Sequence, residues 1–408
     1  MKRVYVLSMM LLFVLLGWSQ STSSSQHIDI KFKNGNSVQI NANDVDYFEF
    51  TESGNDNPQP VPEPVPEPVS PPVPQPGDND NGKGDMSGKY LTFVAIDSGT
   101  FKLSGNSVSY SLDNGSTWTT LASDTNSPTV QSGKKIMWKG NLLPSREGKG
   151  IGKFYSTSWF NIEGNIMSLV YSDNFEGQTT IYNNQFAGLF GNNHYLINAS
   201  RLVLPTMTLT EECYSAMFWA CTNLTAAPVL PATTLANRCY YNMFADCKSL
   251  TVAPELPATS LAEHCYDGMF LWCSNLTAAP VLPATALTEG CYTSMFGRCT
   301  SLTVAPELPA TSLAERCYES MFNGCTSLTV TPELPARTLA VCCYLNMFSN
   351  CSSLSYVKCL ATDKSTTSCT FNWMGGVSST GTFVKASSMN SWTRGDSGIP
   401  INWIVKNE

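Results

Sequence analysis

The hydrophobic positions between Cys213 and Cys351 repeat with a period of 26 residues. Each of six copies reads CYxxMFxxC. In the first five this is followed by (S/N)LT and a proline-containing stretch that ends in LPA, and the sixth continues with SLS. The paired cysteines are Cys213 and Cys221, Cys239 and Cys247, Cys265 and Cys273, Cys291 and Cys299, Cys317 and Cys325, and Cys343 and Cys351. A fixed period of roughly 20 to 50 residues is typical of a solenoid, whose repeats bury their apolar faces by stacking on one another. The pattern therefore predicts a solenoid.

Within one copy, the residues from Leu261 to Cys273 predict an amphipathic helix. At about 100° per residue, the positions that recur in kind lie on one half of the helical wheel and the variable positions lie on the other half. Ser260 and Glu263 have the spacing of a capping box at the start of this helix. The recurring half is expected to face the core.

The segment after each second cysteine predicts a short strand. Ser301 to Ala305 is extended in character and ends at Pro306, which lacks the N–H needed for a ladder hydrogen bond. Leu302 and Val304 are expected to face inward. Because strands stack at about 4.8 Å and helices at about 10 Å, we expect the solenoid to curve with its strands on the concave side. That concave face would carry small residues such as Thr225 and Ala227.

The first half of the chain predicts β-structure on either side of a linker. Residues 26–52 alternate apolar and polar side chains around Asn34-Gly35, which is typical of a hairpin turn. Residues 53–88 are rich in proline and then in glycine and aspartate, which predicts a semi-rigid rod that ends in a flexible joint. Residues 89–183 contain short alternating runs separated by turn residues, which predicts an antiparallel β-sandwich.

Residues 111–118 of this predicted sandwich match an Asp box, S-x-D-x-G-x-T-W. In that motif the aspartate caps a tight hairpin turn and the tryptophan packs beneath it. Sialidase-like propellers carry several copies, whereas this chain carries one. A stabilised hairpin is therefore expected here in preference to a sialidase site.

Composition and charge narrow the classes of partner and the location. The chain has 408 residues, 42% of them hydrophobic, and a net charge of -8, so we expect several domains and no nucleic-acid partner. Residues 1–19 resemble a signal peptide, with Lys2 and Arg3 before an apolar run. No other apolar run is long enough for a membrane span. The protein is expected to be exported and to be extracellular, at the cell surface or periplasmic.

The phrase (M/A)FxxCxxL, followed by proline and a variable turn, resembles the BspA-like leucine-rich repeats of surface proteins from gut Bacteroidetes. The resemblance covers about residues 187–369, with Asn193 in the cysteine position of a degenerate first copy. It implies an exported recognition or adhesion protein without catalysis or cofactor. The fold class that we expect is an α/β leucine-rich-repeat solenoid over residues 187–354, closed by a C-terminal cap at 355–408.

The fifteen cysteines leave three possibilities open. Buried free thiols are favoured, because cysteines on neighbouring helices would be about 10 Å apart and a disulfide needs Cα atoms within about 7 Å. A few bridges near Cys342, Cys343, Cys359 and Cys369 are the second possibility. Zinc is the third and has little support, because no C-x2-C pair occurs and the three histidines are scattered.

No catalytic or metal-binding motif is present, so we expect no enzyme activity. A solenoid recognises its ligand through exposed residues that differ between copies. The candidate ligand patch on the solvent side of the predicted helices consists of Trp219, Tyr241, Leu271 and Trp272. Packing of these residues on loops or on the preceding β domain is the alternative.

The expected function is binding or adhesion to a host, glycan or microbial surface ligand. A structural role in a surface complex and an accessory role in glycan-acting machinery are the alternatives.

Overall fold

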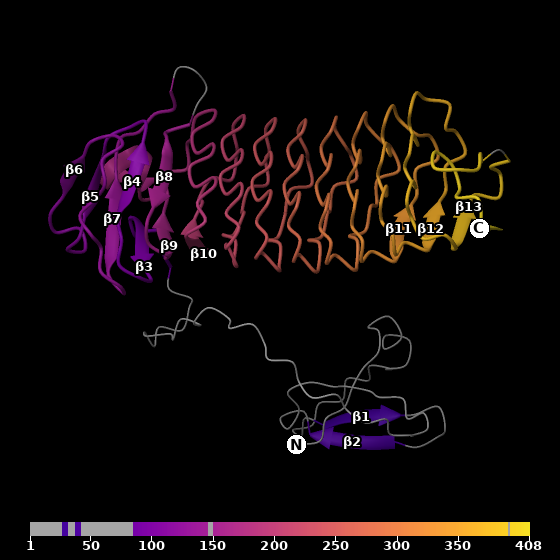
Figure 1. The fold of residues 1–408 in the computed structure, drawn as a ribbon, viewed down its shortest axis with the longest axis horizontal. Helices are drawn as coiled ribbons and strands as arrows, with labels where there is room; N and C mark the ends of the chain where they lie inside the picture. Colours follow the sequence, from indigo (N-terminus) through magenta and orange to yellow (C-terminus); the bar gives the residue numbers. More distant parts are fainter. Residues whose placement is uncertain (1–26, 32–36, 42–84, 146–149, 391) are drawn as a thin grey trace. The chain divides into compact units, whose positions relative to one another are not determined.

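A computed structural model describes residues 27–31, 37–41, 85–145, 150–390 and 392–408 (Figure 1). The chain divides into two units, Met1–Val73 and Pro74–Glu408. In the first unit, β1 (His27–Lys31) and β2 (Ser37–Asn41) form an antiparallel pair with Ile28 opposite Ile40. This confirms the predicted pairing of strands, while the predicted signal peptide and proline rod lie outside the described residues.

The second unit begins with a mixed β-sheet. Its six strands lie in the order β10 (Leu196–Val203), β9 (Phe160–Asn165), β3 (Leu91–Ala95), β7 (Lys135–Lys139), β5 (Val108–Ser111) and β6 (Thr119–Leu121). A second sheet pairs β4 (Phe101–Ser104) with β8 (Lys153–Ser156). The strand pairs within residues 89–183 are antiparallel, as predicted for that range. β10 lies beyond that range and pairs in parallel with β9, so the sheet as a whole is mixed. The reason is that β10 also pairs with the first repeat, where Ala199 N donates to Ala226 O at 3.0 Å.

The β-sheets and the repeats share one hydrophobic core. The Phe93 ring on β3 lies 4.9 Å from Phe154 on β8 and 6.0 Å from Phe190, which belongs to the first coil. Phe190 in turn stacks on Phe218 of the next coil at 5.5 Å. The β domain therefore closes the N-terminal end of the solenoid as a packed cap.

The repeats contain no helix in the part of the chain that the structure describes, so the predicted amphipathic helix and its capping box are wrong. The described helical segments are α2 (Ser168–Tyr171) and η2 (Ser172–Asn174), both before the repeats. Every second N–H of the CYxxMFxxC segment bonds the carbonyl three residues back, as Met217 N does to Tyr214 O at 3.2 Å. The N–H groups between them donate to the next coil, as Phe218 N does to Met243 O at 2.9 Å. In an α-helix every backbone N–H would instead donate to the carbonyl four residues earlier in the same segment, so this bonding pattern is not that of an α-helix.

The backbone reverses its curl at every fourth residue of this segment, which we call the turn arm. In the first copy the left-handed residues are Glu212, Ala216 and Ala220, with φ of 52°, 51° and 55°. The buried pairs Cys-Tyr and Met-Phe recur every four residues, whereas a helix repeats every 3.6 residues. Four residues at about 100° per residue advance by about 400°, which is about 40° more than a full turn. Residues that recur every four positions are therefore spread over a broad arc when they are plotted on a helical wheel. The period of four thus belongs to successive turns.

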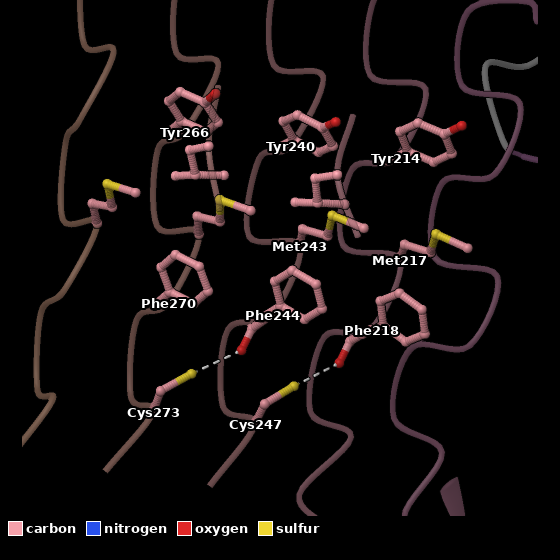
Figure 2. Close-up of a cluster of buried hydrophobic side chains, with 14 of the residues drawn as sticks. Tyr214, Met217, Phe218, Tyr240, Met243, Phe244, Cys247, Tyr266, Phe270 and Cys273 are labelled. Atoms are coloured by element: carbon pink, nitrogen blue, oxygen red, sulfur yellow. Dashed lines mark hydrogen bonds between the residues drawn. The ribbon is translucent and has the colours of Figure 1, made fainter. Parts of the chain in front are cut away.

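The buried side chains of the turn arms form continuous ladders (Figure 2). Neighbouring tyrosine and phenylalanine rings within the six copies stack in parallel at centroid distances of 5.4 to 6.2 Å. Because this spacing is close to that of stacked strands, the two sides of the coils have nearly the same repeat distance. The mismatch that predicted a curved stack is absent, and the coils follow one another in a nearly straight row in Figure 1.

The opposite side of each coil is extended and pairs with its neighbours mainly through isolated parallel bridges, such as Val252 with Ala278. A proline removes one N–H donor from this side in each of the first five copies, including Pro332 within β11 (Val330–Leu334). A regular parallel sheet forms at the C-terminal end, in the order β11, β12 (Tyr356–Cys359), β13 (Thr382–Lys385) and β14 (Ile404–Asn407). Leu302 is buried as predicted, whereas Val304 is 67% exposed, so its predicted inward position is wrong. Val304 belongs to a single bridge and not to an alternating strand.

Both ends of the ladders carry substitute residues. At the first coil, Asn193 Nδ2 donates to Phe154 O at 3.3 Å, just as Cys221 Sγ donates to Phe190 O at 3.1 Å. This supports the interpretation of Asn193 as the cysteine equivalent of a degenerate copy. At the other end the turn geometry recurs once more at residues 368–376, where Trp373 stacks on Tyr344 at 6.0 Å and on Trp392 at 5.5 Å.

Candidate functional site

The outer face of the turn arms carries the residues that differ most between copies. After each buried pair, two side chains point away from the core, and the four predicted patch residues occupy such positions on three consecutive coils. Trp219 is 47% exposed, Tyr241 is 36% exposed and Trp272 is 50% exposed, while Leu271 is partly buried. We call these four residues the outer aromatic patch.

The patch is supported by the coils beneath it. Trp272 occupies a left-handed position with φ of 65°, and the guanidinium of Arg298 lies 5.3 Å from its ring. Leu271 lies over Gly297, where an added Cβ would stand 2.8 Å from Leu271 Cδ1. Trp219 is two coils before Leu271 in the same column, with Ala245 between them. The arrangement is an open surface, because none of the four lines a described cavity.

Charged groups flank the patch on the same face. His264 Nδ1 lies 3.0 Å from Asp267 Oδ2, and Arg238 lies 3.6 Å from Glu212. Burial raises the pKa of the Asp267 carboxyl, while its hydrogen bond with His264 acts in the opposite direction. The aromatic side chains are therefore set among polar groups and do not form a wholly apolar surface.

The extended side of the coils carries exposed valines at two repeat positions, which the sequence analysis missed. Val252, Val304 and Val330 share one position, and Val229 and Val281 share the other. At the second position valine alternates with Glu255 and Glu307 over the first four copies, and the fifth copy carries Glu333. This alternation was readable in the sequence, but the assumption of inward-facing strand residues concealed it. The expected row of threonines, Thr225, Thr251, Thr277 and Thr303, is exposed on this side.

All fifteen cysteines are free and buried, which confirms the favoured prediction. The distance argument behind it was wrong, because adjacent coils are closer than helices would be. Burial raises the pKa of Cys221 and Cys273 to about 12, so these thiols stay protonated at neutral pH. Each second cysteine also donates to the phenylalanine carbonyl of the preceding coil, as Cys273 Sγ does to Phe244 O at 3.1 Å (Figure 2). The thiols act as small apolar groups with one hydrogen bond each.

No protein family, curated protein or solved structure matches this chain. The chain contains repeats with a 26-residue period that follow a mixed β-sheet domain. Among the described residues, no cluster of three or more histidine, cysteine, aspartate or glutamate side chains has the arrangement of a metal site. The described part of the chain also has no helix long and apolar enough to cross a membrane.

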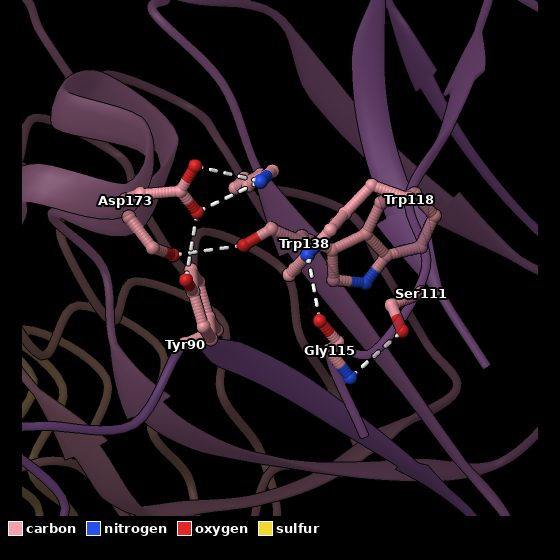
Figure 3. A network of polar contacts seen from close by, with 8 residues as sticks. Tyr90, Ser111, Gly115, Trp118, Trp138 and Asp173 are labelled. Carbon is pink, nitrogen blue, oxygen red and sulfur yellow. Dashed lines mark hydrogen bonds and ion pairs between the residues drawn. The ribbon is translucent and has the colours of Figure 1, made fainter. Parts of the chain in front are cut away.

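The Asp box has the structural role that the sequence suggested (Figure 3). Asp113 accepts hydrogen bonds from Thr117 N at 2.9 Å and from the Ser111 hydroxyl at 2.7 Å. These bonds, above all the one from the Thr117 hydroxyl, lower the pKa of Asp113 to about 2. Trp118 Nε1 donates to Gly115 O at 3.1 Å across the turn.

The tryptophan of this box joins a polar cluster on the sheet (Figure 3). Lys139 Nζ lies 4.3 Å from the centre of the Trp118 ring and 2.7 Å from Asp173 Oδ1. Tyr90 donates from its hydroxyl to the same carboxylate oxygen at 2.7 Å. The carboxylate of Asp173 on η2 thus joins Lys139 of β7 and Tyr90, which precedes β3, so the cluster ties η2 to the sheet.

Proposed function

We propose that this protein is an exported, non-enzymatic binding or adhesion protein of the BspA-like leucine-rich-repeat kind, which recognises a protein or glycan ligand on a surface. The proposal rests on the residues that resemble those repeats and on the signal-like N-terminus. No cofactor is part of it. An extracellular, cell-surface or periplasmic location follows from the same N-terminal segment.

The observation that carries the proposal is the outer aromatic patch. Large aromatic side chains are enriched at binding interfaces, and half-exposed tryptophans on a rigid scaffold bury much surface at a small entropic cost. Trp272 also stands at a left-handed position, where the other copies carry smaller or more polar residues or arginine. A bulky aromatic residue in the left-handed region is conformationally unfavourable, and residues in such unfavourable conformations cluster at functional sites.

The test is binding of the mature chain to arrays of glycans and matrix proteins. The Trp219→Ala, Trp272→Gly double variant should lose at least tenfold in affinity for the ligand so found, because two hot-spot side chains are removed. Phe371→Ala is the matched control, since Phe371 is a 59% exposed aromatic on a distant turn arm. Equal affinity of the double variant and the wild type would refute the patch as the binding surface.

The exposed valines favour a second candidate, a structural role in a surface assembly. Val229 and Val281 present apolar side chains on a flat, regular face, which is a property of surfaces that associate. Sedimentation of the mature chain should then show self-association that Val229→Thr, Val281→Thr weakens. A monomer at all accessible concentrations would exclude self-assembly through this face.

A further inference from the structure

The outer face of the β4–β8 sheet carries a small cationic group of side chains. Lys102 on β4 stands directly opposite Tyr155 on β8, and Ser104 stands opposite Lys153. Since side chains alternate along a strand, these four project from one face, while their neighbours Phe101, Leu103 and Phe154 are buried on the other face. The group is therefore presented by two paired strands and not by a mobile loop.

An aromatic ring forms the centre of this group. Tyr155 is 43% exposed, and the ammonium groups of Lys102 and Lys153 lie 5.2 and 5.1 Å from its ring centre. Neither lysine forms an ion pair with a carboxylate among the described residues. The charge of Lys102 helps to lower the pKa of the Asp124 carboxyl, although hydrogen bonds contribute more. That carboxylate accepts hydrogen bonds from the Ser123 hydroxyl and from Gly105 N.

A hollow of about 440 Å³ lies beside the ring, at the junction of the β4–β8 sheet and the first coil. Several of its lining residues are glycines, including Gly105, Gly150, Gly152 and Gly188. The backbone at Gly152 lies close to the carbonyl oxygen of Ser104. Glycine is required there, because its φ is 114° and an added Cβ would overlap that oxygen. Burial lowers the pKa of Lys153, which is the expected effect when an ammonium loses water. Lys153 and Tyr155 line the hollow, whereas Lys102 lies against the Tyr155 ring without lining it. The hollow is therefore a concave surface with one ammonium group in its wall and a second beside its aromatic ring.

We infer that this hollow binds an acidic saccharide, a sugar chain with carboxylate or sulfate groups. The two ammonium groups, which form no ion pair with the carboxylates that the structure describes, complement the anionic group, and their charge stands out on a chain with a net charge of -8. The Tyr155 ring offers a flat apolar surface for the C–H face of a sugar, and Ser104 and Asn106 offer polar atoms for its hydroxyls. A nucleic acid fits less well, because its affinity depends on many phosphate contacts and an acidic chain repels it.

The site is separate from the outer aromatic patch, so the inference stands apart from the proposed function. The experiment measures binding of the mature chain to polygalacturonate, which carries carboxylates, to heparin, which carries sulfates as well, and to neutral dextran. We expect binding to at least one acidic polymer, none to dextran, and release as salt is raised. A preference for either acidic polymer identifies the recognised group. Binding to neither, or equal binding to dextran, overturns the inference.

Charge variants locate the site. Lys102→Gln, Lys153→Gln should weaken binding at least tenfold, since removing a single charge-assisted hydrogen bond has an effect of about that size. Lys102→Arg, Lys153→Arg keeps both charges and should retain most of the affinity, which separates a loss of charge from a loss of fold. Lys358→Gln is the matched control, because that lysine is already paired with Glu333 at 2.7 Å. Unaltered affinity in the double glutamine variant overturns the site.

Trp219→Ala, Trp272→Gly should leave binding to the acidic polymer unchanged. A loss in that variant and not in the lysine variant would move the saccharide to the solenoid and overturn this inference. Failure of the proposed function is a different result, namely that no arrayed ligand depends on Trp219 or Trp272.

Discussion

The second cysteine of each copy shows how one side chain fits the coil at atomic scale. Cys273 is fully buried, and its thiol donates to the Phe244 carbonyl of the preceding coil. That carbonyl also accepts from Cys247 N at 3.1 Å, so it keeps a partner when the thiol is removed. The main cost of removing the sulfur is therefore poorer packing.

We predict that Cys273→Ala lowers the free energy of unfolding by about 1 to 2 kcal/mol, because it leaves a cavity in a close-packed ladder. Cys273→Ser should cost less, since the hydroxyl can donate to Phe244 O as the thiol does. Urea denaturation of the two variants and the wild type measures the difference. A serine variant that is no more stable than the alanine variant would show that the hydrogen bond has no net effect.

The turn arm is the element that distinguishes this solenoid, and its left-handed residues fit against one another between coils. Gly290, with φ of 58°, lies beneath the ring of His264 in the preceding coil, and an added Cβ would overlap that ring. Gly290 therefore leaves room for the His264 ring. Gly268 beside Asn242 and Gly324 beside Arg298 make similar close approaches.

We predict that Gly290→Ala destabilises the protein by more than the roughly 1 kcal/mol expected for a left-handed alanine, because the methyl group meets His264. In a His264→Ala background the same change should cost only about that 1 kcal/mol. Thermal or urea unfolding of all four proteins measures the coupling. Additive effects would mean that the two residues do not oppose each other.

At the scale of the whole second unit, one core runs from the β domain through the repeats to Trp392. This core contains many thiols that burial keeps neutral at pH values where an exposed thiol would ionise. Their folded pKa values are raised above the value of about 8.5 expected in an unfolded chain. Their contribution is therefore complete below about pH 8.5 and is lost as the pH rises toward the folded values.

We predict that the Tm of the protein falls steeply between about pH 8.5 and 10, before tyrosines ionise in the unfolded state. Each buried thiol contributes roughly 1.4 kcal/mol per pH unit in that window, so many thiols act together. Calorimetry across this range measures the effect. Cys273→Ala should reduce the slope by one thiol's share, and a Tm that is constant up to pH 10 would contradict the prediction.

The sequence by itself determined which side chains of the repeats enter the core and that the copies stack. The 26-residue period, the buried Cys-Tyr and Met-Phe pairs and the role of Asn193 follow from residue types and spacing. The outer positions of Trp219 and Trp272 were also predictable, because variable residues must lie opposite the recurring ones on any such arm. These properties depend on burial, which apolar patterning specifies locally.

Only the tertiary structure decided the conformation of the arm and the shape of the stack. Each alternate N–H finds its acceptor about 25 residues away, in the next coil, and no local pattern records that partner. The exposure of Val304, the parallel pairing of β10 and the hollow beside Tyr155 depend in the same way on neighbours distant in sequence. Local apolar patterns specify which surfaces are buried, whereas hydrogen bonds between coils select the backbone that buries them.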